Sequence, residues 1–461
     1  MTDRAAAVPG SFRDPSGFVF ERDGRLFRQV NPVHSQHYDL LMSSGLYEAL
    51  TGEGLLVPHR EADEPGFTGE AYRVLEPERI AFVSNPYEWC FGQLKAAALL
   101  TLRVQGLALD RGMSLRDASA FNVQFRGARP VLIDTLSFER VPQDRPWVAY
   151  RQFCQHFLAP LALMSYGDPR LNGLFRSFID GVPLDLAIAL LPRRARFRPS
   201  LQLHLFSHAR SQARYQRRGG VPRGKDRTFS PRAFRGLLES LRSAVRALDW
   251  SPGRTTWSDY YKDRESYTDQ AFEHKLELVE ELVAKADPTD VWDLGGNVGV
   301  FARMASSRGV PTVCLELDPA AVELNYRKAV EDDDRTLLPL VMDLTNPSPG
   351  IGWEGRERPS LAERGPAELG MALALVHHLA VGNNVPLPRV ASFLADLCRN
   401  LIVEFVPKED PMVQEMLALR EDVFPHYTRE GFEQAFGERF RIERREEVRD
   451  SVRTLYLMHG R

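Results

Sequence analysis

The chain has 461 residues, 43% of them hydrophobic, which is enough for a buried core and more than one domain usually needs. Its 59 basic and 62 acidic side chains nearly cancel, so the formal net charge of -3 gives no overall attraction to nucleic acid or to an anionic membrane. The four cysteines show no CxxC pair and no zinc-finger spacing, which argues against a disulfide framework or a structural zinc site. With neither a signal-peptide core nor a run of about 18 apolar residues, we expect a soluble cytoplasmic protein without a membrane span.

The chain divides into three expected parts. Residues 1–192 mix short strands and helices, residues 193–255 form a basic connector with helices, and residues 256–461 alternate strands and helices. In the first part, Phe18–Val30 is typical of a hairpin that turns at Asp23 and Gly24. Phe91–Asp110 has helical apolar spacing, and 148–164 is a second apolar helical stretch. We therefore expect an α+β amino-terminal domain.

A short motif lies between residues 114 and 138. Asp117 and Asn122 have D-x-x-x-x-N spacing, and Asp134 follows at the end of an apolar run. The motif resembles the catalytic loop of protein-kinase-like folds, which implies a proton-accepting Asp117 and magnesium held by Asn122 and Asp134. Arg28 is the candidate for the phosphate-binding cation of that family, and Glu48 for its partner.

The departures from the kinase pattern are large. Leu115 stands where kinases have histidine, Thr135 and Leu136 follow Asp134 in place of Phe-Gly, and no glycine-rich phosphate loop precedes Gly45. An active kinase would place a metal at Asn122 and Asp134. A degenerate, noncatalytic form agrees better with the departures, and the plain alternative is an accessory domain in which Asp134 pairs with an arginine.

The connector is strongly basic. Between Arg193 and Arg227 there are eleven Lys or Arg and a single acid, Asp226. Glycine and proline interrupt it after residue 218, and some helix is expected around 202–216. We interpret it as a solvated arm or as a docking strip for an anionic substrate or carrier. Nucleic acid is disfavoured because no aromatic interleaving or binding module accompanies the charge.

The last part has the alternation of a mostly parallel sheet that is covered on both faces. Strands are expected at 291–294, 311–317, 337–344, 370–376, 401–406, 440–448 and 454–460. Helices are expected at 298–308, 320–330, 387–399, 412–420 and 429–436. The last two strands are separated only by a short turn, so we expect them to form an antiparallel pair.

The strongest functional signal is a glycine-rich turn after the first of these strands. Glycine lets the chain turn tightly and lets a ligand approach the backbone, and the following helix offers unpaired N–H groups. The next strand ends in an acid that is suited to two ribose hydroxyls, with Glu316 as first choice and Asp318 as second. The third strand ends at Asp343, where a carboxylate can accept from an adenine amino group. The turn contains Asp293, Gly295, Gly296, Asn297 and Gly299.

This combination, DLGGNVG followed by LELD and MDL, resembles class I S-adenosylmethionine (SAM)-dependent methyltransferases over roughly 200 residues. The resemblance implies a Rossmann-like seven-stranded sheet, with SAM as cofactor. It places the methionine end at Asp293, Gly295 and Gly299, the ribose at Glu316 and the adenine at Asp343. Asn297 departs from the family pattern, which has glycine there. NAD is the alternative ligand, disfavoured by the closing strands.

Acceptor chemistry is expected at the ends of the fourth and fifth strands. A histidine, His377 or His378, is suited to take a proton from an attacking hydroxyl, or it only lines the pocket. Glu404 is a candidate pocket wall or substrate partner. No NPPY-type motif is present, which favours oxygen over nitrogen as acceptor. Aromatic residues before the first strand are expected to cover the cofactor or to pack in the core: Trp257, Tyr260, Tyr261 and Tyr267.

The whole chain also resembles a group of bacterial methyltransferases related to a rhizobial host-specificity nodulation protein, through stretches such as DASAFNVQF and LIDTLSFE. That resemblance implies a saccharide or glycolipid setting. The first hypothesis is therefore an enzyme that methylates a hydroxyl of a small molecule or saccharide. A bifunctional kinase-methyltransferase and a noncatalytic SAM-binding scaffold are the alternatives. Nothing in the sequence indicates an oligomeric state.

Overall fold

The computed structural model describes residues 5–142, 146–210, 230–253, 268–418 and 421–461. The chain forms two compact units. The N-terminal unit comprises Met1–Phe125, Arg129–Ser251 and Ile351–Arg358, and the C-terminal unit comprises Arg126–Ala128, Pro252–Gly350 and Pro359–Arg461. The described residues of the expected connector are thus grouped with the N-terminal unit as far as Ser251.

A five-stranded antiparallel sheet begins the N-terminal unit. Its strands are β1 (Ala5–Ala7), β2 (Gly17–Arg22), β3 (Arg25–Val30), β4 (His59–Glu61) and β5 (Arg73–Pro77), in the order β1-β2-β3-β5-β4. The hairpin predicted for residues 18–30 is present, and both turn residues, Asp23 and Gly24, have positive φ, as a two-residue hairpin turn requires. Phe20, Phe27 and Val74 pack together as one buried cluster of this sheet.

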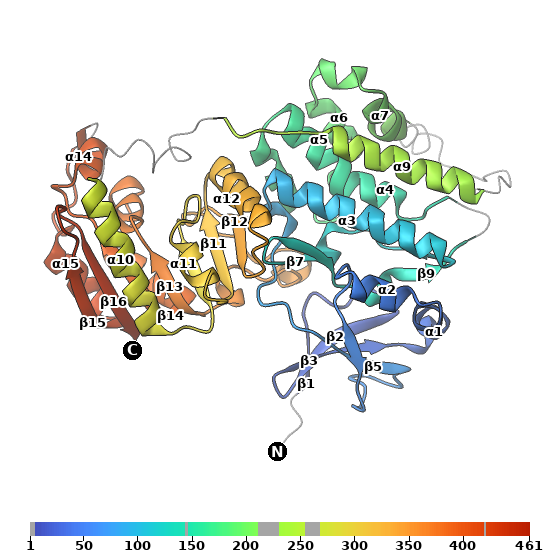
Figure 1. Ribbon diagram of the computed structural model, residues 1–461, viewed down its shortest axis with the longest axis horizontal. Coiled ribbons are helices and arrows are strands. Elements are labelled where there is room, and N and C mark those ends of the chain that lie inside the picture. Colours follow the sequence, from blue (N-terminus) through green and yellow to red (C-terminus); the bar gives the residue numbers. More distant parts are fainter. Residues whose placement is uncertain (1–4, 143–145, 211–229, 254–267, 419–420) are drawn as a thin grey trace. The chain divides into compact units, whose positions relative to one another are not determined.

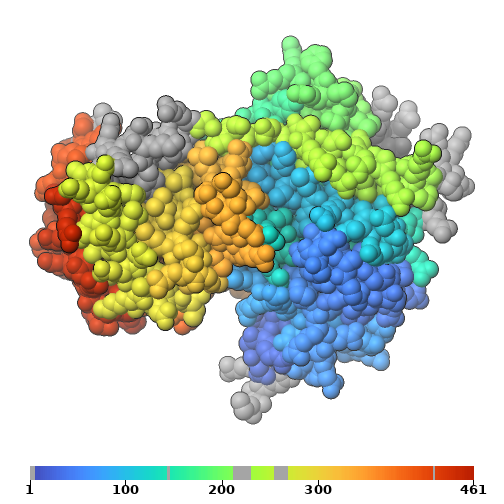
Figure 2. All heavy atoms as spheres, viewed as in Figure 1, coloured from blue at the N-terminus to red at the C-terminus, as the bar shows by residue number. Residues whose placement is uncertain are grey.

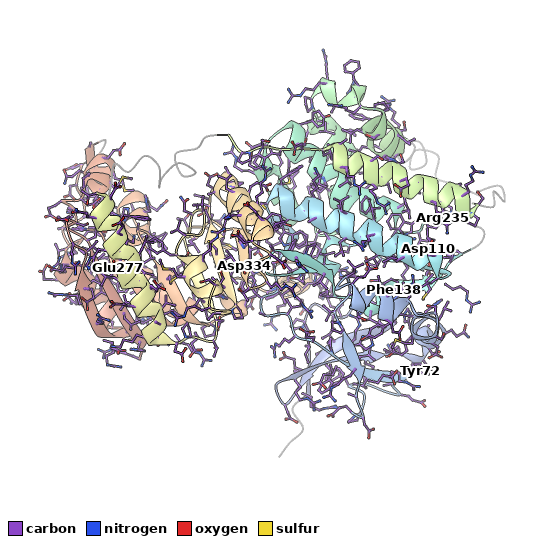
Figure 3. All side chains as sticks on the ribbon, viewed as in Figure 1. Tyr72, Asp110, Phe138, Arg235, Glu277 and Asp334 are labelled. Carbon is purple, nitrogen blue, oxygen red and sulfur yellow. The ribbon has the colours of Figure 1, made fainter. Side chains whose placement is uncertain are left out.

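Helices make up most of the rest of this unit (Figure 1). They are α1 (Ser35–Ser43), α2 (Leu46–Gly52), α3 (Phe91–Asp110), α4 (Tyr150–Phe153), α5 (Ala159–Tyr166), α6 (Leu184–Leu190), α7 (Pro199–Leu201) and α9 (Pro231–Ala247). α3 has the predicted bounds, and a π-helical segment, Cys154–Leu158, joins α4 to α5. α9 packs along α3, and Arg235 pairs with Asp110 at 2.9 Å between their nitrogen and oxygen atoms (Figure 3).

Short strands hold the D-x-x-x-x-N motif. β6 (Met113–Leu115) pairs with β9 (Phe138–Arg140), and β7 (Val123–Arg126) pairs with β8 (Arg129–Leu132). Asp117 follows β6, Asn122 directly precedes β7, and Asp134 follows β8.

The C-terminal unit is built on the seven-stranded, mostly parallel sheet that the sequence predicted. Its strands are β10 (Val291–Leu294), β11 (Thr312–Glu316), β12 (Leu337–Val341), β13 (Ala367–Ala372), β14 (Cys398–Phe405), β15 (Phe440–Glu447) and β16 (Thr454–Gly460). They lie in the order β12-β11-β10-β13-β14-β16-β15. The first five, β10 to β14, are parallel to one another, and β16 is antiparallel to both β14 and β15. The expected closing antiparallel pair is therefore confirmed.

Helices cover this sheet on both faces. They are α10 (Asp269–Ala286), α11 (Ala302–Ser306), α12 (Pro319–Glu331), α13 (Leu387–Leu397), α14 (Pro411–Ala418) and α15 (Arg429–Gly437). Apolar residues of α10 and α11 pack on one set of strand side chains, including Leu369, Met371 and Ile402. Leu401 and Val403, which point to the opposite face, are also fully buried. None of the helices in the described segments has the length and apolar composition needed to cross a lipid bilayer.

Candidate functional site

A pocket of the C-terminal unit lies at the carboxyl ends of β10, β11, β12 and β13, where α/β sheets bind ligands. Six of the sequence-predicted residues line it: Asp293, Gly295, Gly296, Asn297, Glu316 and Asp343. His378 lines it as well, whereas Gly299, His377 and Glu404 are not part of the lining. Side chains far apart in the sequence are thus brought to one cavity by the parallel register of the strands.

The glycine-rich turn holds its shape through the neighbouring strand. The backbone N–H groups of Gly295 and Gly296 both donate to the carbonyl of Leu315, at 2.8 and 3.2 Å. Gly295 has φ +81, and a side chain at Gly296 would overlap the carboxylate of Asp293 and the sulfur of Cys314. Glycine is therefore required for two different reasons, backbone conformation at one position and space at the next.

Two further residues of the turn show how its shape is fixed. Asn297 has positive φ, a conformation that asparagine tolerates better than most residues. Gly299 also has positive φ, and a Cβ there would overlap the amide of Asn325. Gly299 therefore positions the start of the following helix rather than the pocket wall.

Glu316 is held by the backbone at the pocket wall. Its Oε2 accepts from the N–H of Asn297 at 3.0 Å, and its Oε1 accepts from the N–H of Asp318 at 2.9 Å. The side chain is nearly buried, and burial raises its pKa. Asp318, the second choice for the ribose, instead caps α12 by accepting from the N–H of Ala320, and it is not part of the lining.

Asp293 carries a buried oxygen without a partner. Its Oδ2 has no hydrogen-bond partner among the described residues, and the residue is buried, with only 2% of its surface exposed. Burial and the nearby charge of Glu316 raise its pKa to about 7. An unpaired carboxylate oxygen in a cavity is costly unless a donor or a cation binds there, so this atom marks where a positively charged ligand group would be stabilised.

Lys275 supplies a cation to the same pocket from α10. Its Nζ donates to Glu404 Oε2 at 2.7 Å and lies 5.0 Å from the centre of the Phe301 ring. Lysine and glutamate are both buried, and burial lowers the pKa of Lys275. Glu404, expected as a pocket wall, thus acts on the pocket through Lys275 rather than by lining it.

A second buried ion pair, between Arg453 and Asp410, lies next to Glu404. Arg453 is fully buried and forms a bidentate pair with Asp410, at 2.7 and 3.0 Å. Its guanidinium also lies 4.0 Å from Glu404 Oε1. Glu404 is therefore shared between two buried cations, which compensates for the desolvation of its charge.

The two histidines differ in their surroundings. Their rings are 4.2 Å apart, but only His378 lines the pocket. Burial and the charge of Arg453 lower the pKa of His378 to about 4. His377 is fully buried, its pKa is held well below the usual range, first by burial, and neither ring nitrogen has a partner among the described residues. Both rings are therefore neutral near pH 7.

Asp343 occupies the end of β12. Its Oδ1 accepts from both the backbone N–H and the hydroxyl of Thr345, at 2.8 and 2.6 Å. These bonds fix the carboxylate at the pocket rim. Leu317 also lines the pocket and leaves 56% of its surface exposed, so an apolar surface lies beside the acids.

The residues of the D-x-x-x-x-N motif in the N-terminal unit also lie near one another. Arg28 Nη2 lies 2.5 Å from Asp134 Oδ1, and the hydroxyl of Ser137 donates to Asp134 Oδ2 at 2.5 Å. Asn122 donates to that hydroxyl, and burial and the charge of Asp134 raise the pKa of Asp117. Within the described residues no group of three or more His, Cys, Asp or Glu is arranged to hold a metal ion.

Nodulation protein NoeA of Rhizobium meliloti (strain 1021) is similar to the chain over nearly its whole length. The two are 36% identical over 460 residues, which cover 98% of this chain and 96% of the relative. The chain belongs to the NoeA family. No protein-family profile matches the sequence. The resemblance to a rhizobial nodulation protein is thus confirmed.

Solved structures resemble only part of this NoeA-family chain. The crystal structure of WbdD is 18% identical and matches 47% of this chain and 46% of its own, with a TM-score of 0.31, so the chain spans about half of WbdD. Magnesium protoporphyrin IX methyltransferase (ChlM) from Synechocystis PCC 6803, solved with bound SAH, is 18% identical over 44% of this chain and 98% of its own, with a TM-score of 0.32. PH0226 protein from Pyrococcus horikoshii OT3 is 17% identical over 45% of this chain and 100% of its own, with a TM-score of 0.33. At these TM-scores the likenesses carry no argument.

Several pocket residues of the NoeA-family chain were not singled out from its sequence. Lys275 belongs to a helix rich in charged residues, and its partner Glu404 is 129 positions away, so no local pattern distinguishes it. Leu317 directly follows Glu316, and this adjacency was the available signal. The expected aromatic cover, Trp257, Tyr260, Tyr261 and Tyr267, lies outside the described residues.

Removing one partner of the Lys275–Glu404 pair should be strongly destabilising. We expect Glu404→Ala to lower the free energy of unfolding by about 3–5 kcal/mol, because it leaves buried Lys275 uncompensated. Lys275→Met should also destabilise, and Lys275→Met with Glu404→Ala should cost clearly less than the sum. Urea denaturation of the four proteins measures this coupling.

The exposed pair of Lys328 and Asp332 serves as the control. Lys328→Met should leave the denaturation midpoint unchanged, since solvent already screens that pair. Additive effects of the Lys275 and Glu404 substitutions would show that the two charges do not stabilise each other.

Proposed function

We propose that the C-terminal unit is a SAM-dependent methyltransferase that acts on an oxygen of a small molecule or saccharide. One observation carries the proposal: Asp293, Glu316 and Asp343, at the ends of three adjacent strands, line one pocket together with the Gly295–Gly296 turn. Three carboxylates beside a glycine turn suit an adenosine that carries a positively charged tail.

The residues present fit this cofactor. Glu316 has its two oxygens fixed by backbone donors, and each oxygen keeps a lone pair for a ribose hydroxyl. Asp343 would accept from the adenine amino group, with Leu317 against the base. The unpartnered oxygen of Asp293 would accept from the ammonium of the methionine end, and Lys275 would attract its carboxylate.

The negative charge of the pocket favours SAM over NAD as the ligand. Asp293 and Glu316 both lie at the turn, and their mutual repulsion contributes to the raised pKa of Asp293. A pyrophosphate beside two carboxylates would be repelled, whereas an ammonium and a sulfonium are attracted. This charge pattern supports SAM and opposes the dinucleotide alternative.

The acceptor would be oriented by His378. When bound, SAM supplies a methyl group on a sulfonium that is open to attack by a nucleophile. His378 lines the pocket and is neutral near pH 7 because its pKa is about 4, so it can accept a hydrogen bond from an acceptor hydroxyl and receive its proton. His377, behind it, would hold the ring of His378 in place.

The saccharide setting rests on family membership and on the sequence. NoeA is named as a nodulation protein, and the chain lacks the NPPY-type motif of many methyltransferases that act on amide or base nitrogen. A noncatalytic scaffold remains the alternative, but a buried, unpartnered oxygen on Asp293, a residue of the pocket lining, is a cost that a ligand site explains.

Loss of the ribose contact should weaken cofactor binding. We expect Glu316→Ala to raise the dissociation constant for SAM by an amount equivalent to about 1–3 kcal/mol, since hydrogen bonds to a charged group are lost. Asp318→Ala is the matched control, because Asp318 caps α12 and does not line the pocket. Equilibrium dialysis with radiolabelled SAM gives both affinities, and an equal loss in the two variants would refute the ribose assignment.

Substituting the histidines should slow methyl transfer without changing the affinity for the cofactor. His378→Ala is expected to slow methyl transfer about 10²-fold or more, as loss of a general base does, while the affinity for SAM stays within a factor of two or so, a change of under about 0.5 kcal/mol. His377→Ala should slow transfer less, because His377 does not line the pocket. Transfer rates with labelled SAM and an accepted substrate check this, and an unaffected rate in His378→Ala would mean that no histidine acts on the acceptor.

For the N-terminal unit we propose a kinase-like arrangement without phosphoryl transfer. Both oxygens of Asp134 already have partners, Arg28 on one and Ser137 on the other, so a magnesium ion would have to displace them. The chain should therefore show no magnesium-dependent ATP hydrolysis above that of the Asp134→Asn variant. Hydrolysis that disappears in Asp134→Asn would instead establish the bifunctional kinase-methyltransferase.

A further inference from the structure

The N-terminal unit carries an exposed basic surface at residues 190–203, which we name the arginine–phenylalanine patch: Leu190, Arg193, Arg194, Arg196, Phe197, Arg198 and Leu203. All seven side chains are exposed. In Figure 1, α6 and α7 lie at the end of this unit opposite the five-stranded sheet, and Figure 2 shows the same green region as a projection of the unit. The patch is therefore accessible on the unit that carries it.

The arginines of the patch are ordered without acidic partners. Arg194 donates to the carbonyl of Tyr166 at 3.0 Å, and Arg198 donates to the hydroxyl of the same residue at 3.0 Å. Arg196 lies 5.7 Å from the centre of the Phe206 ring. Among the described residues no acid forms an ion pair with any of the four arginines. Arg194, Arg196 and Arg198 thus lie beside neutral groups, and within the described part of the chain the charges of the patch remain available to an anion.

Apolar side chains stand among these charges. Phe197 is 84% exposed, the highest value for a large hydrophobic side chain in the described residues, and Leu190 and Leu203 are 47% and 56% exposed. Phe197 ends a 3-10 helix of three residues per turn, so it lies on the same side as Arg194. The π-helical segment that carries Leu203 packs against both α6 and that 3-10 helix.

We propose that the arginine–phenylalanine patch binds the surface of an anionic phospholipid bilayer. Cations next to protruding apolar side chains are the combination that an interfacial membrane site requires, since the cations meet lipid phosphates while the apolar groups enter the acyl boundary. A nucleic acid or an acidic protein segment would need the cations, but neither accounts for three exposed aliphatic and aromatic groups together. The site would bring the enzyme to a membrane surface and does not depend on the proposed methyl transfer.

Vesicle co-sedimentation of the full chain tests this. We expect binding to vesicles of equal phosphatidylcholine and phosphatidylglycerol, little binding to phosphatidylcholine alone, and release at high sodium chloride concentration. Arg193→Gln with Arg196→Gln should lower the partition coefficient about 25-fold, at about fivefold for each arginine. Phe197→Ser should lower it at unchanged charge.

The control variant is Arg389→Gln with Arg441→Gln. Both arginines are exposed on the C-terminal unit, so their substitution removes the same amount of charge as the patch variant. It should retain the binding of the wild type, and the thermal midpoints of all variants should agree. Absence of binding to the anionic vesicles at low salt would overturn the proposal, as would equal losses in the patch and control variants. Tighter binding to duplex DNA, lost in the same patch variants, would also overturn it by assigning the patch to nucleic-acid phosphate.

Discussion

The C-terminal unit depends on how buried charges are balanced at the carboxyl edge of its sheet. Asp293 and Glu316 repel each other beside the glycine turn, and burial raises the pKa of both. Lys275 compensates from one side, and it is itself held by Glu404. Because one oxygen of Asp293 has no partner among the described residues, its negative charge is left uncompensated whenever that carboxyl is ionised. A cationic ligand at this edge would complete the balance, and that physical requirement underlies the proposed cofactor.

The part of this site that sequence analysis could predict is the part encoded locally. A glycine turn identifies the end of β10, and acids at the ends of the next two strands must meet it because parallel strands end at one edge. The histidine pair was predicted in the same way, from its place at the end of a strand. Only the structure distinguishes His378, which lines the pocket, from His377, which does not. Glu404 was predicted from its place at a strand end, but Lys275 and its pairing with Glu404 were not, because that pairing links positions 129 residues apart.

In the N-terminal unit, too, the local elements could be predicted from the sequence, whereas contacts between distant residues could not. Its hairpin and α3 followed from turn residues and apolar periodicity, and the D-x-x-x-x-N spacing correctly grouped residues that lie near Asp134. Whether such a cluster holds a metal depends on which groups occupy the carboxylate oxygens. Here Ser137 of the following 3-10 helix and Arg28 of β3 occupy them, and the D-x-x-x-x-N spacing does not encode the contact with Arg28.

Calorimetric titration with SAM near pH 6.5, in two buffers of unlike ionisation enthalpy, tests the central claim most directly. With a pKa of about 7, Asp293 is partly protonated in the free protein near pH 6.5, and a bound ammonium would favour the carboxylate. We therefore expect saturable binding with release of up to one proton, and an affinity that rises between pH 6 and pH 8, by at most about tenfold per pH unit. Absence of binding at millimolar SAM, or binding with no proton release, would contradict the account.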